Sequence, residues 1–183
     1  MGRFVRACEI PKGPWLGVAV LPRRFFQRNA AAVARDLVGP VLEGLVDGAV
    51  RRARLVETEA YVGPHDRASH SRHGPTPRNA AMFGRAGHAY VYFVYGMHYC
   101  LNVVCGDNDG QAVLLRAAEP LDGWDARLSG PALLAKAFGL TRADDGVDLV
   151  KGPLRLLASG GPTFEDHGGA AGFHFFTALG LDF

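Results

Sequence analysis

Apolar and polar residues alternate along several short segments in the middle of this chain, a pattern typical of β-strands that have one face on a core. Turn-forming dipeptides separate the segments, and Asp47-Gly48 and Tyr95-Gly96 stand where hairpin turns are expected. The predicted strands cover residues 41–46, 49–57, 89–94, 98–105 and 112–117, and the alternation of the second continues to residue 61. Most neighbouring strands are close in sequence, so the pattern favours antiparallel pairing.

Helix signals flank these strands. Asn29 is a favourable cap for a helix over residues 30–37 that stops at Gly39-Pro40, and a second helix runs from Pro131 to Phe138. A short helix is predicted to begin at Thr76-Pro77, with Thr76 as its cap. Residues 1–24 look like an irregular lead-in, and glycine pairs break up residues 160–183.

Two carboxylates stand within the second predicted strand. Alternation over residues 53–61 places Leu55, Glu57, Glu59 and Tyr61 on one face, next to the core. Carboxylates there are costly unless they are paired or take part in chemistry. Two interpretations of Glu59 follow, a general base or the partner of an arginine, and spacing alone favours the ion pair.

Composition narrows the class of protein. The 183 residues are 48% apolar and 21% charged, as in an ordinary globular domain, and the net charge of +2 means that any attraction to nucleic acid must be local. Three cysteines, two of them in an apolar run, favour free thiols in a reducing compartment. No apolar run approaches a membrane span, so we expect a cytoplasmic protein that has no membrane partner.

Aromatic rings and cations are concentrated in one region. All five tyrosines lie between Tyr61 and Tyr99, and residues 67–106 contain four arginines but no Asp or Glu. Aromatic faces beside unopposed cations suit flat bases and a phosphate backbone. Tyr95, at the predicted hairpin tip, is either a core residue of a folded-back hairpin or a wedge that enters a duplex between bases.

Other kinds of site are not supported by the sequence. The spacings of His65, His70 and His73 match no metal motif, and no cysteine is nearby. Neither a phosphate-cradling glycine loop nor a nucleophile signature is present. We therefore expect no metal and no cofactor.

Several ordered motifs then resemble one family, the alkyladenine type of 3-methyladenine DNA glycosylase, also called the methylpurine glycosylase family. The likeness extends from about residue 25 to about residue 139. The motifs are Glu57-Thr58-Glu59-Ala60-Tyr61-Val62-Gly63-Pro64, Ala68-Ser69-His70-Ser71, Thr76-Pro77-Arg78-Asn79, Met82-Phe83, Tyr90-Val91-Tyr92-Phe93-Val94-Tyr95-Gly96-Met97, Asn102-Val103-Val104 and Val113-Leu114-Leu115-Arg116-Ala117-Ala118-Glu119-Pro120.

The resemblance implies a role for each matching residue. Glu59 matches the general base that activates a water, and Arg116 matches a residue that helps to hold this water and the nearby backbone. In this family a damaged nucleotide is flipped out of the duplex into a pocket, and Tyr61, His70 and Tyr92 match the residues that sandwich its base. Asn102 matches the residue that obstructs the 2-amino group of normal guanine, and Tyr95, with Met97 beside it, matches the side chain inserted where the base was. The stretches expected to contact the DNA backbone or line the approach to the site contain Thr76, Arg78 and Met82.

The resemblance also implies the fold and the activity. The expected fold is α+β: a single domain over residues 1–183, with a curved, mainly antiparallel sheet (a partly open barrel), peripheral helices and a protruding β-hairpin. The expected activity is monofunctional hydrolysis of alkylated or modified purines (3-methyladenine, 7-methylguanine, hypoxanthine and etheno-adenine) from double-stranded DNA by a monomer, leaving an abasic site. The family's C-terminal strands find no match after about residue 145, so residues 160–183 are read as a divergent tail.

Two alternatives come from other classes. The first is a damaged-DNA-binding protein without catalysis, which would keep the aromatic pocket and the Tyr95 wedge. The second is a single-strand or RNA-binding module based on aromatic stacking. Glu59 and Arg116 argue against the first, because a pure binder has little use for a carboxylate beside the DNA backbone.

Overall fold

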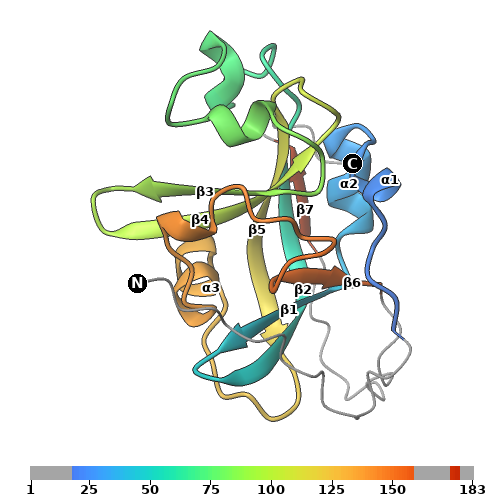
Figure 1. Ribbon diagram of the computed structural model, residues 1–183, viewed down its shortest axis with the longest axis vertical. Coiled ribbons are helices and arrows are strands. Elements are labelled where there is room, and N and C mark those ends of the chain that lie inside the picture. The colour runs from blue at the N-terminus through green and yellow to red at the C-terminus, as the bar shows by residue number, and fades with distance from the viewer. Residues whose placement is uncertain (1–17, 159–173, 178–183) are drawn as a thin grey trace.

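The structure is a computed structural model that describes residues 18–158 and 174–177. A curled, mainly antiparallel sheet forms its centre (Figure 1). The strands are β1 (Val41–Val46), β2 (Ala49–Tyr61), β3 (Ala89–Val94), β4 (His98–Cys105), β5 (Gln111–Pro120), β6 (Arg155–Leu157) and β7 (His174–Thr177). They follow the order β3-β4-β5-β2-β1-β6, and β7 pairs with β2 in parallel. The predicted α+β class is confirmed.

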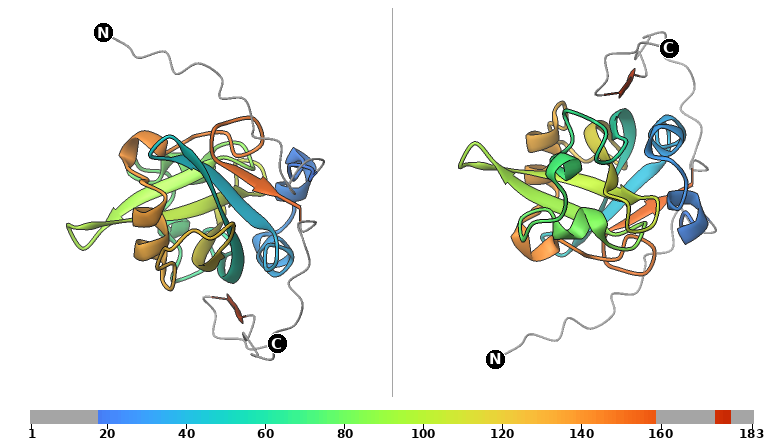
Figure 2. Two further views of the ribbon diagram at one scale, coloured as in Figure 1. Left: turned by 90° about the horizontal axis from the view of Figure 1, so that it is seen from below. Right: turned by 90° about the horizontal axis from the view of Figure 1, so that it is seen from above.

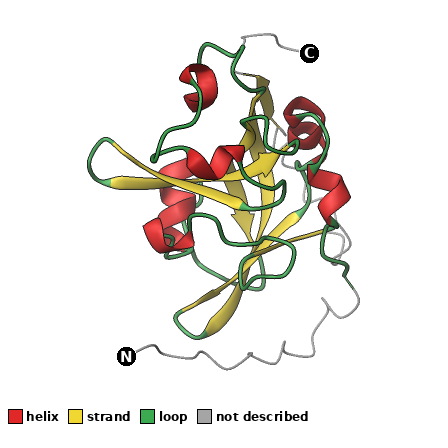
Figure 3. Cartoon of the chain, turned by 45° about the horizontal axis from the view of Figure 1, so that its top comes forward, coloured by secondary structure: helices red, strands yellow, loops and turns green. Residues whose placement is uncertain are grey.

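Short helices cover the sheet (Figures 2 and 3). They are α1 (Arg23–Phe26), α2 (Ala30–Asp36), α3 (Pro131–Ala137) and the 3-10 helices η1 (His70–His73), η2 (Ala80–Phe83) and η3 (Arg142–Asp144). Apolar residues of the α-helices, such as Phe26, Val33 and Leu134, join Leu101 and Leu115 of the sheet in the main core. A smaller cluster of Met82, Tyr90, Val104 and Ala112 is built around η2. The sheet thus carries apolar packing on both faces.

Strand β2 changes its buried face part of the way along. Leu55, Thr58 and Ala60 are buried, whereas Glu57 and Glu59 are only half-buried. The pairing with β5 shifts register between Leu55 and Glu57 and again between Glu57 and Thr58, and such bulges alter which face a residue occupies. The prediction that Leu55 shares a face with the two carboxylates is therefore wrong, because simple alternation does not hold across a bulge.

Thr58 links this part of β2 to α2. Its buried Oγ1 donates a hydrogen bond to the carbonyl oxygen of Ala34 at 2.8 Å. Thr58→Val is expected to lower the free energy of unfolding by about 1 kcal/mol, because valine keeps the shape but removes the donor. Urea denaturation measures the difference, and an unchanged midpoint would contradict the burial of this hydroxyl against α2.

Two other expectations need correction. No helix begins at Thr76-Pro77: the backbone N–H and Oγ1 of Thr76 both bond to Asn79 Oδ1, a turn follows, and the 3-10 helix η2 begins at Ala80. Helix α1 begins at Arg23, inside the predicted lead-in, of which residues 1–17 lie outside the described part. Strand β6, which is absent from the predicted strands, pairs with β1.

The predicted divergent tail, residues 160–183, lies outside the described residues except for β7. The backbone of β7 runs beside β2, with His174 opposite Glu57 and Phe176 opposite Glu59. No helix within residues 18–158 is long and apolar enough to cross a membrane.

Candidate functional site

Four strands place one row of residues side by side across the sheet. Glu59 on β2 pairs with Leu114 on β5, Leu114 pairs with Asn102 on β4, and Asn102 pairs with Tyr90 on β3. Directly paired residues of neighbouring strands point to the same face. The carboxylate, the amide and the phenol therefore share one face, although Glu59 and Asn102 are 43 positions apart in the sequence.

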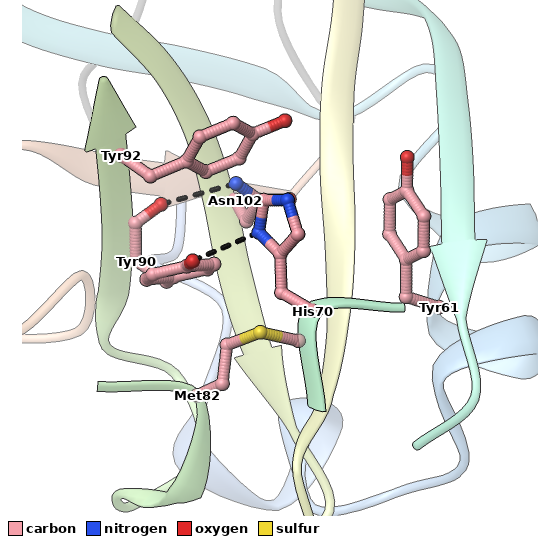
Figure 4. Close-up of a pocket in the computed structure, with 6 residues that line it drawn as sticks. All are labelled: Tyr61, His70, Met82, Tyr90, Tyr92 and Asn102. Carbon is pink, nitrogen blue, oxygen red and sulfur yellow. Dashed lines mark hydrogen bonds between the residues drawn. The ribbon is translucent and has the colours of Figure 1, made fainter. Parts of the chain in front are cut away.

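A pocket opens on this face. Figure 4 shows the side chains that line it converging from β2, η1, η2, β3 and β4. They are Tyr61, His70, Met82, Tyr90, Tyr92 and Asn102. The structure thus brings together the four residues that sequence analysis assigned to a base pocket. It adds Met82, expected along the DNA approach but buried here in the pocket wall, and Tyr90.

Tyr90 had no predicted role. Its hydroxyl lies 2.9 Å from His70 Nδ1, and its buried ring lies 5.4 Å from that of Tyr92. Burial raises the pKa of Tyr90 to about 12, so the phenol stays neutral. The i, i+2 spacing of Tyr90 and Tyr92 within one strand could have placed both rings on the same face.

His70 occupies a crowded position at the pocket. Its ring meets Tyr92 almost perpendicularly, with 4.5 Å between centroids, which leaves no space for a third ring between them. Burial, and secondarily the charge of Arg78, lowers the pKa of His70 below its usual value of 6.5. The imidazole is therefore neutral at neutral pH.

Arg116 joins the two carboxylates of β2. Its Nη1 lies 2.5 Å from Glu59 Oε2, and its Nε lies 2.6 Å from Glu57 Oε1. The hydrogen bonds to both carboxylates outweigh partial burial and raise the pKa of Arg116. The predicted pairing of Glu59 with an arginine is confirmed. A carboxylate that is paired with an arginine can still accept a proton from water.

Tyr61 connects this ion-pair cluster with the pocket. Burial raises the pKa of the Tyr61 phenol strongly, and the charge of Glu59 and a hydrogen bond to it act in the same direction. Tyr61 lines the pocket and touches Glu59, so the carboxylate lies at the edge of the aromatic cavity.

Asn102 is held in place beneath the pocket. It is 1% exposed, and its Nδ2 donates to the carbonyl oxygen of Tyr90 at 3.1 Å. This bond ties the amide to the neighbouring strand and fixes the side chain that a bound molecule would meet.

The β3–β4 hairpin carries exposed apolar side chains at its tip. Tyr95 is 88% exposed and Met97 is 68% exposed, which excludes the interpretation of Tyr95 as a core residue. Figures 1 and 2 show these strands extending past the rest of the sheet. Exposed rings of this size indicate a surface that contacts another molecule.

The arginines of residues 67–106 lie at the surface of the protein. Arg67, Arg72, Arg78 and Arg85 are all exposed, and Arg78 Nη2 donates to the carbonyl oxygen of Phe93 on the hairpin at 3.2 Å. Thr76 lies in the adjoining turn and does not line the pocket. In the part of the chain that the structure describes, no group of three His, Cys, Asp or Glu residues has a metal-binding arrangement.

Comparison with known proteins supports one family throughout this region. The family model for methylpurine-DNA glycosylase matches residues 24–168, which includes residues 146–168 of the segment in which no family motif was found. A protein of Anaeromyxobacter dehalogenans (strain 2CP-1) is 54% identical over 131 residues, which make up 70% of this chain and 62% of the relative. A protein of Burkholderia lata is 49% identical over 154 residues, 76% of this chain and 72% of the relative.

A third relative, from Myxococcus xanthus, is 49% identical over 148 residues, 79% of this chain and 76% of the relative. All three are provisionally named 3-methyladenine DNA glycosylases. The matched part spans less than two thirds of the Anaeromyxobacter protein. From the family match over most of its length and these identities, the chain belongs to the methylpurine-DNA glycosylase family.

Proposed function

We propose that this protein is a monofunctional DNA N-glycosylase that hydrolyses alkylated or otherwise modified purines from double-stranded DNA. The observation that carries the proposal is the position of Glu59, paired with Arg116, at the edge of an aromatic pocket. All the pocket residues come from one chain, so a monomer suffices.

The pocket chemistry suits a flipped purine. Tyr61, Tyr90 and Tyr92 offer neutral, electron-rich rings, which attract a cationic alkylated base by about 0.5–2 kcal/mol each. Extruding a base costs a few kcal/mol and is cheapest for a damaged one, so stacking in the pocket offsets that cost. His70 lies against Tyr92, so stacking of a base between these two rings requires the imidazole to move.

Hydrolysis follows from the position of Glu59. Glu59 accepts a proton from a water molecule whose oxygen bonds to C1′ of the sugar, and the electron pair of the breaking C1′–N bond leaves with the base. A cationic base leaves as a neutral molecule, so proton donation to it is unnecessary. Neutral lesions such as hypoxanthine and etheno-adenine additionally need a proton donor.

The proposal of a hydrolytic, monofunctional reaction is supported by the distribution of lysines. A lyase step needs an amine that forms a Schiff base with the sugar. The chain has three lysines, Lys12, Lys136 and Lys151. Neither Lys136, which belongs to α3, nor Lys151 lines the pocket, and Lys12 lies outside the described residues. Among the described residues, the pocket therefore has no lysine that could form a Schiff base with the sugar.

Single-turnover base release tests the proposed function. Duplexes that contain 3-methyladenine, 7-methylguanine or one hypoxanthine are incubated with excess protein, and free base and abasic sites are measured. Release of the methylated bases without strand cleavage supports the proposal. Tight lesion binding without release would instead identify a non-catalytic damage-binding protein.

The low pKa of His70 predicts a pH dependence. Above pH 6.5 the imidazole is neutral, and as the pH falls it gains a positive charge beside the cationic base. We expect release of 7-methylguanine to slow as the pH falls below the pKa of His70. In Arg78→Gln the loss should begin at higher pH, because the neighbouring charge that lowers the pKa of His70 is gone.

Arg72→Gln is the matched control for this pH experiment. Arg72 is exposed on the same 3-10 helix as His70, but Arg78 is the arginine whose charge lowers the pKa of His70. The pH profile of Arg72→Gln should match that of the wild type. Coinciding profiles for Arg78→Gln and the wild type would contradict the role of His70.

A further inference from the structure

Glu57 is the second carboxylate in contact with Arg116, and it lies outside the pocket lining. We propose that Glu57 is a positioning residue for base excision: it anchors Arg116 through Nε, so that Nη1 of the guanidinium is presented to Glu59. The inference rests on the proposed function and extends it to a residue that acts through Arg116.

Paired bulges bring the three side chains together. Between Leu55 and Thr58 the pairing with β5 passes over Val56 on one strand and Arg116 on the other. A bulge redirects the side chain of its extra residue and is common beside active sites. Here it places Arg116 where one guanidinium reaches two carboxylates that are two residues apart on β2.

The geometry divides the guanidinium between two partners. Nε meets Glu57 at 2.6 Å, and Nη1 meets Glu59 at 2.5 Å. Arginine and a single carboxylate prefer a two-point, parallel arrangement. Without the Glu57 anchor, Arg116 can rotate into that arrangement with Glu59. Both oxygens of Glu59 would then be held by the guanidinium, in competition with the water that Glu59 must activate.

Charge supports the same assignment. Two carboxylates and one guanidinium leave a net charge of −1 beside the pocket when all three are ionised. A negative field favours the positive charge that develops on the sugar as the glycosidic bond breaks. Removal of Glu57 abolishes this net negative charge and also removes the partner of Arg116 Nε.

A purely structural role is the alternative for Glu57. Its side chain is 25% exposed and that of Arg116 is 35% exposed, and ion pairs with this much exposure contribute little to folding. The side chain of Glu59 is more buried, with 16% of its surface exposed, and it contacts Tyr61. The two carboxylates thus differ in position: Glu59 borders the pocket, whereas Glu57 contacts Arg116 outside the pocket lining.

The test compares Glu57→Ala, Glu57→Gln, Arg116→Ala and the double variant Glu57→Ala/Arg116→Ala. Single-turnover release of 7-methylguanine is measured with saturating protein, and affinity is measured with a duplex carrying a non-hydrolysable lesion analogue. We expect Glu57→Ala to slow release about 10- to 100-fold, as misplacement of a supporting group does, with affinity nearly unchanged. Glu57→Gln keeps an acceptor for Nε and should lose less.

The double variant separates an indirect from an independent effect. If Glu57 acts mainly through Arg116, Glu57→Ala slows release much less in the Arg116→Ala background than in the wild type, and only the effect of its charge is left, whereas independent roles give multiplied losses. Glu119→Ala is the control, because Glu119 is an exposed carboxylate on β5, and this variant should behave like the wild type. Thermal melting confirms that each variant folds. If Glu57→Ala does not fold, Glu57→Gln takes its place in the comparison.

Three outcomes would overturn the inference. Wild-type release rates in Glu57→Ala and Glu57→Gln would exclude a positioning role, and so would multiplied losses in the double variant. Equal losses in affinity and rate would assign Glu57 to DNA binding or general structure instead. Absence of release by the wild-type protein would overturn the proposed function itself, and is recognised before any variant is compared.

Discussion

Glu59→Gln is expected to reduce single-turnover base release by about 10²–10⁴-fold, the range that a general base contributes, while binding of a lesion duplex is retained. Glutamine has nearly the same size as glutamate, and its amide oxygen can still accept the hydrogen bond that Arg116 Nη1 donates to Glu59. The neighbouring residues Thr58 and Ala60 keep their buried positions on the opposite face of β2. The substitution therefore removes basicity and charge with little change of packing.

Glu119→Gln is the matched control for this prediction. It also removes one carboxylate from the same pair of antiparallel strands, but Glu119 is exposed and lies opposite Arg54, away from the pocket. Release and affinity should both match the wild type in the control. Sustained turnover by Glu59→Gln would show that another group activates the water and would leave the Glu59–Arg116 pair as a structural feature.

Much of the sheet could be predicted because local signals agree with the tertiary structure. Residues 41–46, 89–94 and 98–105 form strands with the predicted bounds, and Asp47, at the predicted turn, has a positive φ of 50°. Asn29 caps α2 by accepting a hydrogen bond from the backbone N–H of Ala31 at 2.9 Å. In each case the residues that determine the structure are close in sequence.

The geometry of the site could not be predicted from the pattern of apolar and polar residues, because it depends on contacts between segments that are distant in the sequence. The bulges at Val56 and Arg116 arise from the pairing of β2 with β5, so the faces of Leu55 and Glu57 could not be deduced from β2 alone. Likewise, η1 owes its position to a cap by Ser69 and to the bond from Asn79 Nδ2 to the carbonyl oxygen of His70, which helix periodicity does not reveal. Strand β7 pairs across a long sequence separation with β2.

The family resemblance supplied what periodicity could not. It grouped Tyr61, His70, Tyr92 and Asn102 as one pocket before any geometry was known, and the structure brings these four together. It did not indicate Tyr90, whose hydroxyl lies beside His70, or the contact of Glu57 with Arg116. Both are supporting contacts, which depend on the packing of the folded chain rather than on a motif.

The conformation of the hairpin tip suggests that Tyr95 is kept for binding. Tyr95 and Gly96 have positive φ angles of 52° and 68°, and the N–H of Met97 bonds to the carbonyl oxygen of Val94 at 3.2 Å. Turns with two positive φ angles favour Asn, Asp or Gly, and a bulky residue in this region costs about 1–2 kcal/mol. A large ring that is both exposed and strained does not help the hairpin to fold.

Folding and binding should therefore respond in opposite directions to Tyr95→Asn. Asparagine suits the positive φ, so the free energy of unfolding should stay the same or rise. Affinity for a lesion duplex should fall by about 1–3 kcal/mol, the contribution of one aromatic ring stacked on bases. Thermal melting and equilibrium binding to a non-hydrolysable lesion duplex measure the two effects separately.

Leu45→Asn provides the comparison, because Leu45 is an apolar residue of β1 that is 40% exposed and does not line the pocket. Its loss should leave affinity for the lesion duplex unchanged. If Tyr95→Asn binds as tightly as the wild type, the ring does not enter the duplex. Reduced affinity together with unchanged or higher stability would assign Tyr95 to DNA contact, since a residue needed only for the hairpin would lower both.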